Sequence, residues 1–421
     1  MNKNPQNEAR KIFPDGFNNY TSWFEDLNLL PVYIRSARAA SVTTASGRRL
    51  IDFDLSAGAV YHGYKFQPVQ ESISKALKSG IGAGDCNNYE IQLGLTLKKY
   101  FSDLQQLRFS RSRTEAVLAA LRMARAYTKK AKVLKFSGFY HGQLNEFQVK
   151  DSSGNPALNL PDRPGICRGQ TLDIVVAEYG NRQEVTRVFK RFDRGLAAVI
   201  VEPLATAFGV VFPPGDFLVK LKELCNKYKA VLIFDESVTA CRGSGKKIAT
   251  PVDIIPDLRI LGGIIGGGMP LAAFGGRKDI MDCLQQKPAV FYDGLFSGNI
   301  ITAAAGLAAL QKINSKTVSH IKKLEAMLRE GVRDIIRKKG GDYTFNCWGS
   351  VFSFLQTKEP FPKRREREKE YRRKYHRYYN FMLKSGIRLP LNPFAPCFLT
   401  AAHTCTDINK YLKVVFNYLQ K

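Results

Sequence analysis

Apolar and amphipathic segments alternate along the chain between about residues 110 and 300. Five apolar segments are rich in Val, Ile, Leu and Phe and show no alternation with polar residues: 132–136, 172–179, 196–203, 230–236 and 271–276. Segments of this kind are typical of strands that are buried on both faces of a sheet. Amphipathic sequences such as TEAVLAALRMARAY and DFLVKLKELCNKY lie between them. The alternation therefore predicts an α/β fold with a largely parallel sheet covered by helices.

The pattern changes in about the last seventy residues. Segments 350–356 and 397–404 are predicted strands, and TDINKYLKVVFNYLQK at 406–421 is a predicted amphipathic helix. Near the other end of the chain, SVTTASGRRLIDF at 41–53 predicts a β-hairpin with its turn at 45–47. These elements predict a small α/β domain that draws on both ends of the chain.

The expected organisation therefore has three parts. Residues 1–60 form an N-terminal segment that joins the small domain, residues 61–310 form the large domain, and residues 311–421 form the C-terminal small α/β domain. With 421 residues, of which 44% are hydrophobic, the chain is long enough to bury a sizeable core.

Several classes of protein are disfavoured by composition. The sequence has no run of about 18 apolar residues, as a membrane-spanning helix requires, and its polar N-terminus lacks the apolar region of a secretory signal. The eight cysteines are scattered without a C-x-x-C pair, which is typical of reduced thiols in a cytosolic, hence cytoplasmic, protein. The five histidines are dispersed as well, so we expect no metal site.

The chain is strongly basic, with a formal net charge of +27. Such a surface attracts polyanions and acidic substrates at low salt. Part of the excess lies in KRREREKEYRRKYHRYY at 363–379, which we interpret as a solvated helix with ion pairs rather than a nucleic-acid groove. The four tyrosines within it are expected to hold the helix on the domain beneath, the alternative being stacking on bases: Tyr371, Tyr375, Tyr378 and Tyr379.

A helix start is predicted at Ser112-Arg113-Thr114-Glu115, which has the spacing of a capping box. The backbone N–H groups at the start of a helix, together with the helix dipole, favour an anion. Arg111 and Arg113 add positive charge. Capping boxes are common, however, and most of them bind nothing.

Polar residues follow three of the predicted strands. Ligands of parallel sheets bind at the carboxyl ends of the strands, where Glu202 and Asp235 lie. A buried carboxylate at Asp235 requires a cationic partner, either a core arginine or the pyridinium nitrogen of a ligand. Tyr140 and His141 follow another strand, where an aromatic ring would lie over a flat ligand.

A glycine-dense segment, PDLRILGGIIGGGMP at 256–270, has the composition of an active-site loop but no side chain suited to chemistry. Together with GRRLIDF, RTEAVLAALRMARAYT, KFSGFYHG, VEPLATAFGVVFPP, LCNKYKAVLIFDE and LFSGNIITAAAGLAAL, this segment resembles the class III aminotransferases of pyridoxal-phosphate fold type I. Within that family the chain is most similar to the glutamate-1-semialdehyde 2,1-aminomutases. The resemblance covers nearly the whole chain.

The resemblance implies a cofactor, pyridoxal 5'-phosphate or pyridoxamine 5'-phosphate, at named positions. Its phosphate would lie at the helix start, near Ser112, Arg113 and Thr114, and near Ser297 in the segment 294–299. Tyr140 would stack on the ring with His141 beside it. Asp235 would bind the pyridine nitrogen and make the ring an electron sink, and Glu202 would lie close to it. The family is dimeric and segment 294–299 reaches the other subunit's site, so a homodimer is expected.

The same comparison shows departures from the family. In the glycine-dense segment the family has a lysine that forms a Schiff base with the cofactor, and that position is Gly263 here. Other family residues are replaced as well: the loop glycine by Arg113, the preceding Asn by Arg111, a phosphate-binding Thr by Leu295, a Val under the ring by Ser237 and an Asn by Ala207.

Three hypotheses follow. In the first, the protein binds pyridoxal or pyridoxamine phosphate, or a related anionic ligand, non-covalently. It performs altered amino-transfer or imine chemistry on a small amino or keto acid or sugar, with His141 as the acid–base group. In the second, it binds no cofactor and is a pseudoenzyme, a scaffold or regulatory subunit that pairs with an active paralogue. In the third, the fold is kept and the basic surface binds nucleic acid or an acidic polymer, which only the net charge supports. All three predict little or no aminomutase activity.

Overall fold

A computed structural model describes residues 5–14, 18, 32–80, 86–149, 161–244, 248–358 and 365–420. The chain forms two compact units. One consists of Met1–Gln67, Phe208–Val210 and Ser315–Lys421, and the other of Pro68–Ala207 and Val211–Asn314. We call them the terminal unit and the central unit.

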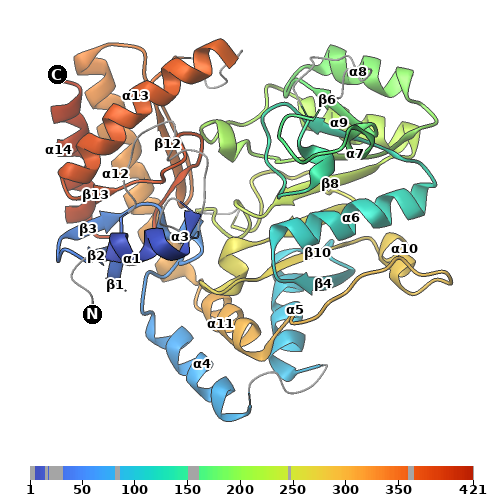
Figure 1. The fold of residues 1–421 in the computed structure, drawn as a ribbon, viewed down its shortest axis with the longest axis horizontal. Helices are drawn as coiled ribbons and strands as arrows, with labels where there is room; N and C mark the ends of the chain where they lie inside the picture. Colours follow the sequence, from blue (N-terminus) through green and yellow to red (C-terminus); the bar gives the residue numbers. More distant parts are fainter. Residues whose placement is uncertain are drawn as a thin grey trace. The chain divides into compact units, whose positions relative to one another are not determined.

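The central unit contains a seven-stranded sheet in the order β4-β10-β9-β8-β7-β5-β6 (Figure 1). Its strands are β4 (Gln106–Ser110), β5 (Lys132–Phe136), β6 (Ile174–Ala177), β7 (Leu196–Val201), β8 (Val231–Glu236), β9 (Leu258–Leu261) and β10 (Ala272–Gly276). Neighbouring strands from β9 to β6 are parallel, whereas β10 is antiparallel to both β9 and β4. All five strands predicted here, and the largely parallel sheet, are confirmed.

Two strands of this sheet were not predicted. β9 lies within the glycine-dense segment, where Arg259 interrupts the apolar run. That guanidinium is nevertheless buried, because its Nε donates to Asp103 at 2.7 Å and its Nη1 to Glu236. β4 is an edge strand with mixed polarity and only one fully buried residue, Ser110. Both strands therefore lack the local signal of a buried strand.

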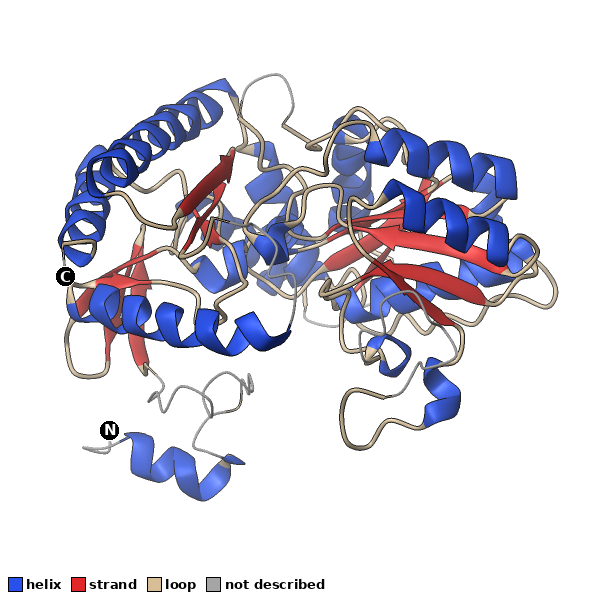
Figure 2. Cartoon of the chain, turned by 90° about the horizontal axis from the view of Figure 1, so that it is seen from above, coloured by secondary structure: helices blue, strands red, loops and turns tan. Residues whose placement is uncertain are grey.

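Helices cover both faces of this sheet (Figure 2). The longer helices of the central unit are α4 (Gln67–Lys78), α5 (Asn88–Tyr100), α6 (Arg113–Thr128), α8 (Arg182–Arg191), α9 (Phe217–Tyr228) and α11 (Ile300–Gln311). The shorter turns are η2 (Asn145–Phe147), α7 (Arg168–Thr171), η4 (Thr206–Phe208), η5 (Gly263–Gly266), α10 (Lys278–Met281) and η6 (Asp282–Leu284). α6 buries an apolar face that includes Val117, Leu121 and Met123 against the strands, which fixes the start of this helix at the carboxyl edge of the sheet.

The terminal unit has two small sheets. One has the order β1-β2-β3-β13 and the other β11-β12-β14. The strands are β1 (Ile34–Arg38), β2 (Ser41–Thr44), β3 (Arg49–Asp52), β11 (Thr344–Trp348), β12 (Val351–Leu355), β13 (Ile387–Arg388) and β14 (Cys397–Phe398). The helices are α1 (Pro5–Ile12), α3 (Leu55–Gly58), α12 (Ser315–Lys339), α13 (Arg365–Lys384) and α14 (Cys405–Tyr418).

The predicted hairpin and terminal helix are confirmed. β2 and β3 pair antiparallel, and Gly47 in the turn has φ +85°. The strand predicted at 397–404 was too long, because it ends at Phe398. Thr400 leaves the sheet to donate to the carbonyl of Tyr61 at 2.8 Å, and Thr404 already caps α14.

Helix α13 is anchored by its tyrosines, as predicted. Tyr371, Tyr375, Tyr378 and Tyr379 are all buried. The hydroxyl of Tyr371 donates to the carbonyl of Pro393 at 3.3 Å, and that of Tyr375 to the carbonyl of Pro390 at 2.5 Å. These rings are therefore unavailable to stack on bases. Residues 363 and 364 of the predicted helix lie outside the described residues.

The glycine-dense segment packs on α11 through backbone contacts. A Cβ added to Gly306 in α11 would lie 2.0 Å from the carbonyl oxygen of Ile265, and one added to Gly267 would lie 2.4 Å from that of Ala305. Both distances are far below a real contact. These glycines therefore allow a loop and a helix to touch directly.

None of the helices in the described ranges is long and apolar enough to cross a membrane.

The close contact between loop and helix gives a matched pair of glycine substitutions. Gly306→Ala is expected to destabilise the protein by about 1–3 kcal/mol or more, because the added methyl overlaps Ile265. Gly94→Ala in α5, where nothing lies within 4 Å of the new Cβ, is expected to stabilise it by about 0.5–1 kcal/mol. Urea unfolding measures both values. Equal effects of the two substitutions would contradict the packing role of Gly306.

A buried histidine in the terminal unit predicts acid sensitivity. His403 stacks on Phe53 with ring centroids 4.6 Å apart, and its Nδ1 accepts from the backbone N–H of Thr400 at 3.0 Å. Burial lowers the pKa of His403 from 6.5 to about 4. Below pH 6.5 the unfolded chain therefore binds a proton that the folded chain does not, so stability is lost as the pH falls from 6.5 to 4.

At about 1.4 kcal/mol per pKa unit, the contribution of this group reaches about 3 kcal/mol at pH 4. His403→Asn keeps an acceptor for Thr400 and is expected to lower stability at pH 7 but to reduce the loss between pH 6.5 and 4. Denaturant unfolding at a series of pH values checks this. An unchanged slope would show that His403 does not titrate as described.

Candidate functional site

Two carboxylates meet at the carboxyl edge of the central sheet. Asp235 lies near the end of β8, and Glu202 directly follows β7, the parallel neighbour of β8. Their side chains are 0% and 4% exposed, respectively. The next residue, Glu236, points elsewhere and pairs with Arg259 and Thr250. Adjacent strands therefore bring two buried acids together, as their positions in the sequence predicted.

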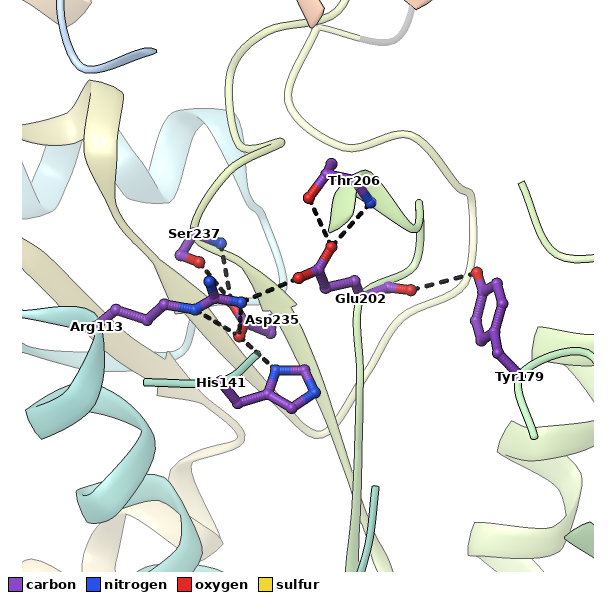
Figure 3. Close-up of polar contacts among 7 residues, drawn as sticks. All are labelled: Arg113, His141, Tyr179, Glu202, Thr206, Asp235 and Ser237. Carbon is purple, nitrogen blue, oxygen red and sulfur yellow. Dashed lines mark hydrogen bonds and ion pairs between the residues drawn. The ribbon is translucent and has the colours of Figure 1, made fainter. Parts of the chain in front are cut away.

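Asp235 has hydrogen-bond donors on both oxygens (Figure 3). Its Oδ2 accepts from Nε of Arg113 at 2.9 Å and from Nη2 at 2.6 Å, and lies 2.7 Å from Nδ1 of His141. Its Oδ1 accepts from the backbone N–H of Ser237 at 3.1 Å and from the Ser237 hydroxyl at 2.6 Å. The carboxylate therefore receives five hydrogen bonds from the protein itself.

Arg113 bridges the two acids. Its Nη2 also donates to Oε1 of Glu202 at 3.1 Å. The other oxygen of Glu202 accepts from the backbone N–H of Thr206 at 2.9 Å and from its hydroxyl at 2.7 Å. The Arg113 side chain is 20% exposed, which makes it the most exposed of these three side chains.

The start of α6 directs Arg113 into this position. Ser112 is the N-cap, and its hydroxyl accepts from the backbone N–H of Glu115 at 3.3 Å. The second half of the predicted capping box is absent, because the Glu115 carboxylate instead accepts from the backbone and guanidinium of Arg111. Arg113 is the first residue of the helix and turns toward the sheet, whereas Arg111 stays outside.

The charges of the cluster support one another. Burial opposes the charge of Asp235, but Arg113 and the hydrogen bonds from His141 and Ser237 hold the pKa of Asp235 well below its usual range. Burial also disfavours the charge of Arg113, yet Asp235 and Glu202 together raise its pKa. Burial raises the pKa of Glu202 against the opposing charge of Arg113. The guanidinium of Arg113 thus offsets the negative charge of both Asp235 and Glu202.

His141 is neutral at pH 7, because burial lowers its pKa to about 4 despite the neighbouring Asp235. A neutral ring beside an ionised acid carries its proton on Nδ1 and donates it to Asp235. The other nitrogen, Nε2, is buried without a hydrogen-bond partner among the described residues. The side chain is 0% exposed, which leaves His141 as a support of Asp235 rather than an accessible acid–base group.

The remaining predicted site residues lie around this cluster or away from it. The ring of Tyr140 is half-exposed, and its centroid lies 5.4 Å from Cζ of Arg113. The Thr114 hydroxyl accepts from the backbone N–H of Gln143 at 3.0 Å. Ser297 contacts its own loop, with its hydroxyl 3.3 Å from that of Tyr292, and Leu295 is exposed. No contact joins Ser297 to Asp235 in the described residues.

Gly263 lies beside Ser237 at the start of η5. Its φ is +54°, a conformation that a residue with a side chain rarely adopts. A Cβ added there would lie 3.3 Å from the carbonyl oxygen of Ser237 and 3.6 Å from Nη2 of Arg242, which is buried. Arg242 was not predicted as a site residue: its Nε donates to the nearby carbonyl of Val238 at 2.6 Å, and only the fold brings it close to Gly263. A lysine at position 263 would therefore be strained and close to a second cation.

These residues do not fit a pyridine ring on Asp235. In this structure the cation on Asp235 is Arg113, as in the core-arginine alternative, and a ring nitrogen would have to displace that guanidinium to bind there. The sequence predicted Arg113 as a positive charge at the helix start, but not which anions it binds. The anions prove to be carboxylates of the same chain, one of them 122 residues further along.

The sequence of the chain matches a known protein family. Residues 25–344 match the model of a family described as "Aminotransferase class-III". The chain is 33% identical to glutamate-1-semialdehyde 2,1-aminomutase of Akkermansia muciniphila over 418 residues, which are 99% of this chain and 98% of that protein.

The fold has close counterparts among solved structures. An omega-transaminase from Sphaerobacter thermophilus has a TM-score of 0.87 and 26% identity, with 99% of this chain and 96% of that one covered. A glutamate-1-semialdehyde-aminomutase from Pseudomonas aeruginosa PAO1, a lysine-to-alanine variant in complex with PMP, has a TM-score of 0.85 at 22% identity, with coverage of 99% and 93%. The second likeness shows the fold alone.

The family uses pyridoxal phosphate or pyridoxamine phosphate as its cofactor. The family match spans most of the chain, and the aminomutase is similar over nearly its full length. The chain therefore belongs to the class III aminotransferases and has the α/β fold of type I pyridoxal-phosphate-dependent enzymes.

Proposed function

We propose that this chain is a catalytically inactive class III aminotransferase, which acts as a scaffold or regulatory subunit. The observation that carries this proposal is the bridge from Arg113 to Asp235 and Glu202. In the family pattern, Asp235 is the residue that receives the cofactor's ring nitrogen. Here its oxygens already bind an arginine, a histidine and a serine.

The position of the catalytic lysine supports the same conclusion. The resemblance aligns that lysine with Gly263, whose backbone conformation and neighbouring Arg242 both disfavour it. A positioned acid–base side chain is typically worth ~10²–10⁴-fold in rate. His141 cannot replace it in this arrangement, because its side chain is fully buried against Asp235.

A second candidate function keeps a cofactor without a covalent bond. Its support is that Asp235, Glu202 and Tyr140 still lie together at one edge of the sheet. When bound, pyridoxamine phosphate would supply an amino group and an electron sink for chemistry on a small amino or keto acid. Arg113 would have to leave both acids first, and that requirement favours the inactive form.

We also infer a homodimer, or a dimer with an active paralogue. Phe291, Leu295 and Phe296 are 75%, 60% and 62% exposed. Side chains of this kind, close together in one segment, are typical of a surface that binds protein. In the family pattern this segment reaches the site of the other subunit, so an active partner would still receive it from this chain.

Addition of cofactor separates the two functions. The purified chain is expected to show no bound-cofactor absorption and no rise in melting temperature with pyridoxal or pyridoxamine phosphate, because Arg113 already binds Asp235. Turnover of glutamate-1-semialdehyde is expected to be at least about 100-fold below that of an active aminomutase assayed in parallel. A saturable rise in melting temperature would establish binding and support the second function instead.

Restoring the amine alone is expected to fail. Gly263→Lys introduces the missing side chain, but φ of +54° strains it and Arg113 still occupies Asp235. We expect a lower melting temperature and no covalent adduct with pyridoxal phosphate after borohydride reduction, as read by mass spectrometry of the intact chain. An adduct at position 263 would show that the rest of the site is competent and contradict the proposal.

A further inference from the structure

We propose that Arg113 is a built-in replacement for the cofactor's ring, and that its removal opens a binding site for small planar cations between Asp235, Glu202 and Tyr140. This inference rests on the proposed function, since it explains how the fold persists without a cofactor. It adds a class of ligand, small planar cations, for a site that Arg113 occupies in the natural chain.

The first support is the shape of the occupant. A guanidinium is flat, delocalised and always charged, and it presents its donors along one edge. In this structure the edge formed by Nε and Nη2 faces Oδ2 of Asp235 at 2.9 and 2.6 Å. A charged ring nitrogen would offer a single donor to the same oxygen. The guanidinium therefore supplies the charge and the hydrogen bonding that such a ring would supply.

The second support is a contact on the flat face of the Arg113 guanidinium, whereas the first concerned its edge. The ring of Tyr140 lies 5.4 Å from Cζ of Arg113, within the range of a cation–π contact. In the family pattern Tyr140 is the residue that stacks on the cofactor ring. The two contacts expected of the ring, one at its edge and one on its face, thus both go to one side chain.

The third support is the charge balance. Asp235 and Glu202 are both buried, and Arg113 is the cation that joins them. His141 is neutral and donates only a hydrogen bond. Without Arg113, two acids would face each other without a cation between them. A small cation that enters the opened site would restore the balance, which is the basis of chemical rescue.

The experiment compares Arg113→Ala with Arg111→Ala. Arg111 lies two residues earlier, just before α6, and is exposed; in the described part of the chain its ion pair is with Glu115. Arg113→Ala is expected to lower the melting temperature by several degrees and Arg111→Ala by little. Methylguanidinium chloride at up to about 10 mM is the probe, with sodium chloride as the salt control. It should raise the melting temperature of Arg113→Ala saturably and leave the natural chain and Arg111→Ala unchanged.

The double variant Arg113→Ala with Asp235→Asn tests the receiving acid. It should show no rescue by methylguanidinium. Pyridoxamine phosphate is the second probe, and we expect it to stabilise Arg113→Ala but not the natural chain. If Arg113→Ala does not fold, the triple variant with Asp235→Asn and Glu202→Gln removes all three charges at once and is expected to fold.

The outcomes separate this inference from the proposed function. Binding of pyridoxamine phosphate by the natural chain would overturn the proposed function, whatever Arg113→Ala does. No binding by the natural chain, with Arg113→Ala as stable as the natural chain or not rescued by methylguanidinium, would overturn this inference alone. Failure of both Arg113→Ala and the triple variant to fold would also overturn it, because Arg113 would then act by packing rather than by charge.

Discussion

The stability of the central unit depends on one arginine side chain that neutralises two acids buried at the edge of its sheet. Parallel packing of β7 and β8 brings Glu202 and Asp235 side by side in a region that water does not reach. Two unpaired acids in such a place would be strongly unfavourable. In the family a cofactor brings a positive ring nitrogen to this edge. In this chain the positive charge is part of the polypeptide, and it arrives with the first residue of α6.

This substitution changes what the fold requires in order to be stable. A protein whose buried acids are neutralised by a dissociable ligand gains stability from the ligand only when the ligand is present. A protein whose own arginine neutralises them is stable alone but cannot exchange the occupant. In this structure Arg113 binds both Asp235 and Glu202, and its charge offsets the cost of burying the two acids. It also gives His141 and Ser237 a purpose, since both hold the Asp235 carboxylate in place.

The sequence predicted those features that arise from local pattern. The apolar segments became strands, the tyrosines of α13 became anchors, and Ser112 became an N-cap, because each depends on residues within a few positions. β9 was not predicted, because the burial of Arg259 depends on Asp103 and Glu236, which are distant in the chain. The pairing of Arg113 with Asp235 was left open for the same reason. Sequence showed that each charge needed a partner, and only the fold showed that they were partners of each other.

The packing of the glycine-dense segment affects how the same glycines are interpreted in related sequences. Its glycines let η5 rest directly on the backbone of α11, as the short distances at Gly267 and Gly306 show. That contact is needed whether or not a lysine stands between the glycines. Selection for folding alone would therefore maintain these glycines, independently of any chemistry at position 263. Glycines at these positions in a related sequence are therefore evidence of the same packing of loop on helix, and they carry no information about activity.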